Sequence, residues 1–287
     1  MWDELNQKTM EHLSRGELTQ AQQSAEKALA EAEKALGSED PIVARALNNL
    51  AEVFRAQKRY DLAEPLWNRS IEIRKKTLGP QHAEVATAMT NLGGAYFEQG
   101  RYAEAERLFL NALRILEIAL GNDHSHVASA LLNLAAVYRV REKYPGARPL
   151  YEKAIAIQER TLGSDHPEVG TSINGLASLF ESQLRFKDAE PWYRRALEIA
   201  EKSFGPYHPH VATSLFNLAG VLAQQGNFSE AEPMVQRAVA VIETNFGAES
   251  LLVADAMENL SDFYEMAGRA TEAEEFREKA VKIRGGR

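Results

Sequence analysis

A valine that returns every 42 residues constrains the fold of this chain more than any other feature of the sequence. It stands at Val43, Val85, Val127, Val169, Val211 and Val253. A leucine and a glycine recur with the same spacing, at Leu50, Leu92, Leu134, Leu176, Leu218 and Leu260 and at Gly37, Gly79, Gly121, Gly163, Gly205 and Gly247. A fixed period of this length is typical of solenoids, in which each unit buries its apolar face only against its neighbours.

The repeat predicts a single continuous domain over residues 1–287. Length alone would suggest about two domains, but a stacked array has no fixed size. The first and last units are expected to be atypical, because each has one face without a neighbour. The predicted units are a degenerate N-terminal repeat at 1–42, regular repeats at 43–84, 85–126, 127–168, 169–210 and 211–252, and a C-terminal capping repeat at 253–287.

Each unit is predicted to contain two amphipathic helices, which makes the fold class all-α. In the first unit these helices cover Trp2 to Ser14 and Leu18 to Leu36, and Gly16 between them suits a left-handed turn. In the second unit, helix A runs to about Ala56, and helix B runs from Tyr60 to Leu78. Small residues recur where the two helices face each other, which lets their axes approach to about 8–10 Å.

A family resemblance lies in the pattern Leu47-x-x-Leu50-Ala51-x-x-Phe54, which is followed by Ala63-x-x-x-Trp67. This pattern resembles the tetratricopeptide signature, with leucine in place of the first tryptophan, although that family usually repeats every ~34 residues. The longer period and the loop motif G-x-x-H-P-x-V are similar to the repeats of kinesin light chains and their bacterial relatives. The resemblance implies a right-handed superhelix of antiparallel helix pairs, in which helix A residues line a concave groove that holds extended peptides. It does not imply association with a motor, because residues 1–42 sustain no heptads.

An asparagine ladder is the most informative polar feature on the helix A positions. It consists of Asn49, Asn91, Asn133, Asn217 and Asn259, and Gly175 interrupts it. The resemblance implies that this position faces the groove, where an amide can both donate to and accept from a peptide backbone. The alternative is that the ladder links adjacent helices by hydrogen bonds.

Other positions expected on the same face change from basic through apolar to acidic along the chain. The basic members are Arg45, Arg55 and Arg139, the apolar members are Phe97, Leu132 and Phe216, and the acidic members are Asp255, Glu258, Asp262 and Glu265. We therefore hypothesise a bound peptide whose acidic part lies toward the arginines and whose apolar side chain lies near one of the apolar positions. The alternative is that these charges form an ordinary solvated face.

Four histidines also recur with the period, at His82, His124, His166 and His208. Zinc ligands lie about 2 Å from the ion, whereas equivalent residues of stacked helices lie about 10 Å apart, so the histidines are not expected to share a metal. Asp40 occupies the matching place in the first loop and is a common helix cap. We therefore predict capping as their role, and we predict no metal or other cofactor.

Composition and missing motifs argue against several functions. The chain has no cysteine and a net charge of -8 with both signs interspersed, which argues against thiol chemistry and a nucleic-acid partner. No apolar run is long enough for a membrane span. No glycine-rich phosphate loop or nucleophile motif is present, so the chain is not predicted to be an enzyme. The polar N-terminus indicates a cytoplasmic protein, although an exported chain that had lost its signal would show the same pattern.

These observations together predict a non-catalytic interaction scaffold that binds an extended peptide segment of a partner protein. An alternative is a ligand-sensing or regulatory repeat module that is part of a larger signalling protein. A third hypothesis is weak self-association through the end repeats.

Overall fold

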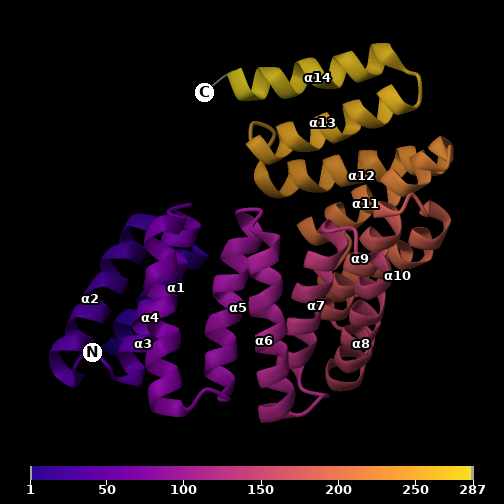
Figure 1. Cartoon of the computed structure of the whole chain (residues 1–287). Helices are drawn as coiled ribbons and strands as arrows, with labels where there is room; N and C mark the ends of the chain where they lie inside the picture. The colour runs from indigo at the N-terminus through magenta and orange to yellow at the C-terminus, as the bar shows by residue number, and fades with distance from the viewer. Residues whose placement is uncertain (1, 286–287) are drawn as a thin grey trace. The chain divides into compact units, whose positions relative to one another are not determined.

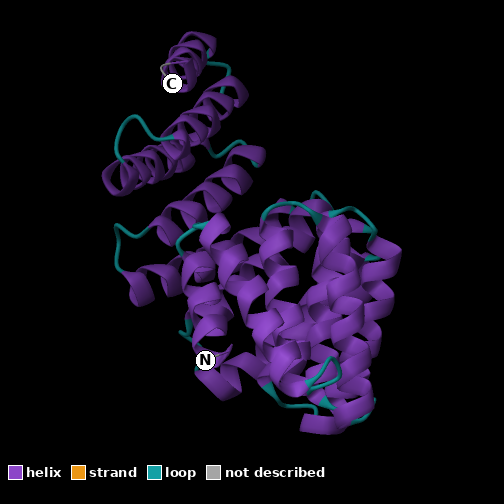
Figure 2. Ribbon diagram, turned by 90° about the vertical axis from the view of Figure 1, so that its left-hand side faces the viewer, coloured by secondary structure: helices purple, strands orange, loops and turns teal. Residues whose placement is uncertain are grey.

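The computed structural model describes residues 2–285, and these residues form fourteen α-helices and no strand (Figures 1 and 2). The helix boundaries predicted for the first two 42-residue repeats are confirmed to within a few residues. The helices are α1 (Trp2–Ser14), α2 (Leu18–Leu36), α3 (Pro41–Ala56), α4 (Tyr60–Leu78), α5 (Ala83–Glu98), α6 (Tyr102–Leu120), α7 (Ser125–Val140), α8 (Tyr144–Leu162), α9 (Pro167–Ser182), α10 (Phe186–Phe204), α11 (Pro209–Gln224), α12 (Phe228–Phe246), α13 (Leu251–Met266) and α14 (Ala270–Gly285).

The helices form two compact units, residues 1–142 and residues 143–287. In the first unit, α1 packs against α2, α3 against α4 and α5 against α6, and the odd-numbered helices α1, α3, α5 and α7 also contact one another in sequence. In the second unit, α9 packs against α10, α11 against α12 and α13 against α14, and α11 contacts α13 directly. We call the half-exposed side of the odd-numbered helices in each unit the odd-helix face.

The repeating residues form the buried core of both units. All six valines of the period, from Val43 to Val253, are fully buried, and the matching leucines are at most 5% exposed. The alanines that recur in both helices of a repeat are also buried, as Ala51 and Ala63 illustrate. The residues that recur every 42 positions are therefore core residues.

The turn between the two helices of each 42-residue repeat contains one residue with a left-handed backbone conformation, always at the same position. Gly16 has φ +72°, as the sequence predicts, and glycine fills the same place in three other turns. Lys58, Glu142 and Leu184 adopt the same conformation with φ between 57° and 61°. A side chain in this conformation costs about 1–2 kcal/mol, so the repeat enforces the turn even where glycine is absent.

The recurring histidines cap the odd-numbered helices, which confirms the predicted role. Nδ1 of His166 accepts a hydrogen bond from the Glu168 backbone N–H at 3.2 Å. His82, His124 and His208 make the same bond, and Asp40 makes it at 2.8 Å. Among residues 2–285, no three histidine, aspartate or glutamate side chains are placed to hold a metal ion.

Removal of one such cap has a predictable effect on stability. We expect His166→Ala to lower the free energy of unfolding by about 0.5–2 kcal/mol, because one backbone N–H at the start of α9 loses its partner. His166→Asp should retain most of the stability, since Asp40 caps α3 in the same way. Urea unfolding followed by circular dichroism measures both values. An equal loss for the alanine and aspartate variants would contradict a capping role.

Candidate functional site

The first two ladder asparagines link neighbouring odd-numbered helices. Nδ2 of Asn49 donates to Oδ1 of Asn6 at 2.9 Å, which joins α3 to α1. Nδ2 of Asn91 donates to Oδ1 of Asn48 at 3.0 Å, which joins α5 to α3. The helix-linking alternative therefore describes these two positions. Both asparagines remain half-buried on the odd-helix face, so a role in binding stays a prediction for them.

The remaining ladder asparagines differ from the first two. Asn133, Asn217 and Asn259 make no side-chain hydrogen bond within residues 2–285. The ladder is interrupted at Gly175, where an added Cβ would lie 2.6 Å from Cε1 of Tyr151. The unpaired amides can still donate to and accept from a bound backbone.

The arginines predicted to hold the acidic part of a peptide already have partners. Arg45 pairs with Asp3, and the guanidinium of Arg55 lies 2.8 Å from Glu52 and 2.6 Å from Glu98. Burial raises the pKa of Glu52 above its usual range, and Arg55 offsets only part of that effect. The positive charge of Arg55 is thus divided between two carboxylates, and its role in binding stays a prediction.

The other predicted residues of the first unit are only partly exposed. Arg139 is half-buried and interacts with other residues of the chain. Leu132 and Phe97 are also half-buried, and the Phe97 ring packs edge-to-face on Tyr102 at a centroid distance of 5.4 Å. A pocket of about 140 Å³ lies between α5 and α7 and is lined in part by Asn91. Asn91 is thus a predicted residue at the edge of a cavity in the first unit.

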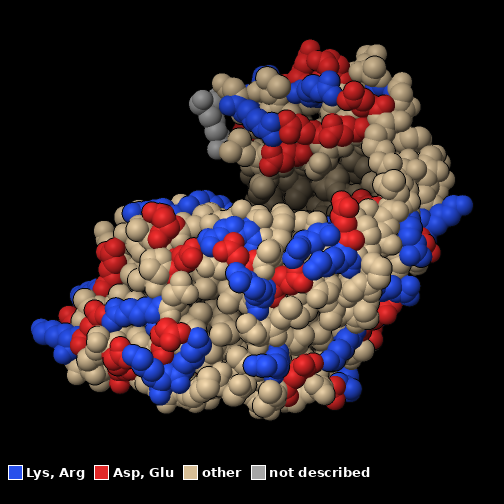
Figure 3. Space-filling model, viewed as in Figure 1, with Lys and Arg blue, Asp and Glu red and all other residues tan. Residues whose placement is uncertain are grey.

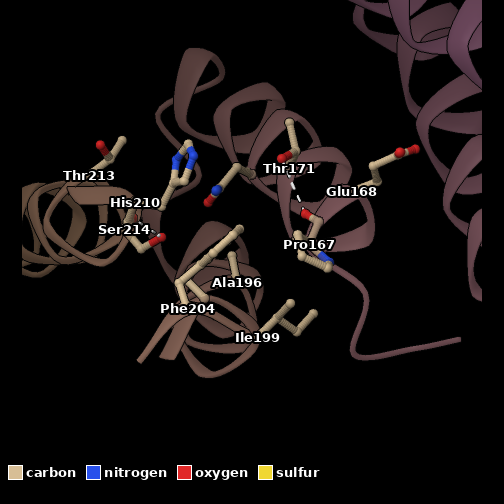
Figure 4. A pocket seen from close by; sticks show the side chains of 12 residues that line it. Pro167, Glu168, Thr171, Ala196, Ile199, Phe204, His210, Thr213 and Ser214 are labelled. Atoms are coloured by element: carbon tan, nitrogen blue, oxygen red, sulfur yellow. Dashed lines mark hydrogen bonds between the residues drawn. The ribbon is translucent and has the colours of Figure 1, made fainter. Parts of the chain in front are cut away.

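A larger pocket lies among α9, α10 and α11 (Figure 4). Its volume is about 190 Å³, and its walls include Gly170, Ala196, Ile199 and Ala200. Ala200 of α10 is small and leaves room on that side of the pocket. The corresponding residues of α4, α6, α8 and α12 are larger, namely Arg74, Leu116, Gln158 and Ile242, whereas α2 has Ala32.

The polar atoms of this α9–α11 pocket are mainly acceptors. Oδ1 of Asn174 is buried and has no hydrogen-bond partner. The Thr171 hydroxyl donates to the Pro167 carbonyl at 3.2 Å, as the dashed line in Figure 4 shows, and the Ser214 hydroxyl donates to the His210 carbonyl at 3.2 Å. A buried polar atom without a partner costs about 1–3 kcal/mol. The pocket therefore favours a ligand with a donor group.

A second site of the same unit lies between α11 and α13, where two adjoining pockets measure about 430 and 180 Å³. Phe216, Gly220 and Asn259 line both pockets. Because they share these residues, we call the two pockets together the α11–α13 hollow. Its other lining residues include Asn217, Asp255 and Asp262. Three residues predicted from the sequence, Phe216, Asn217 and Asn259, thus meet at one place.

A missing aromatic ring accounts for the deeper part of the α11–α13 hollow. Val235 of α12 lines the smaller pocket. The residues at the same place in the four preceding even-numbered helices are Trp67, Phe109, Tyr151 and Tyr193. All four aromatic side chains are at most 4% exposed. Valine leaves unfilled the space that a ring occupies in those repeats.

The charge around the α11–α13 hollow is negative. Acidic side chains gather over α13 in Figure 3, and the carboxylates of Glu181, Asp255 and Asp262 line the hollow. Asp255 lies 2.6 Å from Nη2 of Arg284. Asp262 forms no ion pair within residues 2–285, and none of the lining residues in this part of the chain is a lysine or arginine.

Sequence reasoning missed the small residues that line the α9–α11 pocket and the α11–α13 hollow from behind. Gly170, Ala200 and Val235 are buried or line the pocket floors and do not protrude from the odd-helix face. Their signal in the sequence is a departure from the period at a core position.

None of the fourteen described helices is both long and apolar enough to cross a membrane.

Comparisons with known proteins agree on the fold. A family model described as tetratricopeptide repeat matches residues 10–66, 43–118, 126–202, 174–244 and 212–285. A search of curated proteins finds no match. Among solved structures, BtubC (BKLC) from P. vanneervenii is 22% identical with a TM-score of 0.66, and the match covers 78% of this chain and 90% of that chain.

Two further solved structures extend this likeness. A putative kinesin light chain from Podospora anserina is 24% identical with a TM-score of 0.63, covering 72% of this chain and 99% of that chain. The Rap conjugation gene regulator of plasmid pLS20, in complex with the Phr peptide, is 16% identical with a TM-score of 0.65, covering 97% of this chain and 72% of that chain. At these identities the likeness shows a shared fold.

Proposed function

Because the chain belongs to the tetratricopeptide repeat family, we propose that it is a non-catalytic module that binds an extended segment of a partner protein on its odd-helix face. The observation that carries this proposal is the α11–α13 hollow, where the unpaired amides of Asn217 and Asn259 lie beside Phe216. An extended peptide has free backbone donors and acceptors, and an amide side chain serves both. The likeness to a regulator whose structure contains a bound peptide supports the same proposal.

In the first unit, we propose that the peptide contacts partly or fully exposed residues of α3, α5 and α7. Polar contacts would come from amides and guanidinium groups, and apolar contacts from two side chains. The residues are Asn49, Asn91, Asn133, Arg45, Arg55, Arg139, Phe97 and Leu132. Arg45 and Arg55 would exchange a carboxylate of their own chain for one of the peptide, so they would contribute more to orientation than to affinity.

The test is a peptide array probed with the whole chain and with the double variant Asn217→Ala, Asn259→Ala. Each amide contributes about 0.5–1.5 kcal/mol when it bonds to a peptide, so capture should weaken about tenfold. Asn122→Ala is the matched control, because Asn122 is exposed in a loop outside the odd-helix face. Equal capture by the double variant and the wild type would place the binding site elsewhere.

A second candidate function is regulatory, in which a bound peptide changes the conformation of the repeats. The likeness to the pLS20 regulator over 97% of the chain favours this candidate. Hydrogen exchange with and without a captured peptide separates the two functions. A scaffold should gain protection only around the bound peptide, whereas a regulatory module should change protection in helices of the other unit.

A further inference from the structure

We propose that the α11–α13 hollow selects a partner segment in which one apolar side chain is flanked by a lysine or an arginine. This inference rests on the proposed function and adds the chemistry of the partner. It combines two independent observations on the same hollow, namely its unfilled apolar floor and its negative rim.

The floor of the hollow is suited to one apolar side chain. Val235, Phe263 and Met266 line the smaller pocket of about 180 Å³ beside Phe216. A cavity of about 150 Å³ with similar walls holds benzene, so this space admits a leucine, isoleucine, methionine or phenylalanine side chain. Met266 is 43% exposed, and Leu252 at the wider pocket is 48% exposed. Large apolar side chains at the rim of a pocket are typical of a surface that a partner covers.

The rim of the hollow is suited to a cation. Its carboxylates are those of Glu181, Asp255 and Asp262. The Tyr193 hydroxyl donates to Glu181 at 2.6 Å, which fixes that carboxylate in place. Asp255 shares its charge with Arg284, whereas Asp262 forms no ion pair within the described residues.

The charges of the helices that form the hollow also oppose an acidic partner. α13 contains Asp255, Glu258, Asp262 and Glu265 and no lysine or arginine, and α11 contains neither of these cations. Arg284 and Arg277 of α14 pair with three of the four acidic residues on α13. The unpaired Asp262 is therefore the carboxylate that a cation of the partner would meet.

The experiment uses an array of decapeptides in which every position is varied, probed with the whole chain at low and high salt. We expect the captured peptides to be enriched in lysine or arginine within two positions of an apolar residue, and capture to fall as salt rises. Asp262→Asn should weaken capture of these peptides by about fivefold. Glu278→Gln is the matched control, because it removes the same charge from an exposed position on α14.

A second variant tests the floor of the hollow. Val235→Tyr adds the ring that Tyr151 and Tyr193 supply in earlier repeats, so it should fold and should abolish capture. Enrichment of neutral or acidic flanks, or equal capture by Asp262→Asn, would overturn the inference and leave the proposed function standing. Capture that Val235→Tyr does not change would remove the hollow as the binding site and overturn the inference. An array without any captured peptide would overturn the inference together with the proposed function.

Discussion

Trp67→Ala should lower the free energy of unfolding by about 3–5 kcal/mol, because it removes the largest fully buried side chain of the first unit. Trp67 belongs to the series of residues on the even-numbered helices that fill the space behind the odd-helix face. Phe109 and Tyr151 of the same series lie against Gly93 and Gly175, where an added Cβ would meet each ring at 2.6 Å. Such rings leave little freedom for the surrounding helices to collapse onto a cavity. Urea unfolding, with hydrogen exchange in α3 to α5, measures the loss.

Trp67→Phe is the matched control for this prediction. Phenylalanine occurs at the same position of the period as Phe109. The indole Nε1 of Trp67 is buried without a hydrogen-bond partner, so its removal also relieves an unsatisfied donor. We therefore expect a loss of less than about 1.5 kcal/mol. If phenylalanine and alanine were equally destabilising, the volume of the side chain would not be the cause.

The features that the sequence predicted best depend on residues close together in the chain. The ends of α1, α2 and α4 follow from the apolar period and from turn residues such as Gly16. The helix caps follow from a single side chain and a backbone N–H two residues later, as for His166 and Glu168. Interactions over such short separations leave their full pattern within one repeat.

The features that the sequence did not predict depend on which repeats are adjacent and on what lies behind the surface. The partners of Arg45 and Asn91 come from the preceding repeat, and the sequence alone did not distinguish pairing from binding. The α9–α11 pocket and the α11–α13 hollow gain room from Ala200 and Val235, which are smaller than their counterparts on the adjacent even-numbered helices. Reasoning about the exposed positions of helix A could not find these residues, because they act from the buried side.

The adjacent glycines of α5 should respond in opposite directions to alanine. Gly94→Ala should raise the free energy of unfolding by about 0.5–1 kcal/mol, because alanine favours the helix and nothing lies within 4 Å of the added Cβ. Gly93→Ala should lower it by about 1–3 kcal/mol, because the added Cβ would lie 2.6 Å from Cε1 of Phe109. Phe109 is 2% exposed, so its ring cannot move aside into solvent. Urea unfolding of the two variants measures the difference.

A double-mutant cycle identifies the cause of the difference between the two glycines. Phe109→Val copies the residue that α12 carries at this position and removes the ring. If the clash with the ring causes the loss, Gly93→Ala should become neutral or stabilising in the Phe109→Val background, and Gly94→Ala should keep its effect. A loss from Gly93→Ala that persists without the ring would mean that close approach of the helix backbones sets the limit. The same result would weaken the explanation of the α11–α13 hollow, because that explanation requires the ring, and its absence at Val235, to control the space behind the odd-helix face.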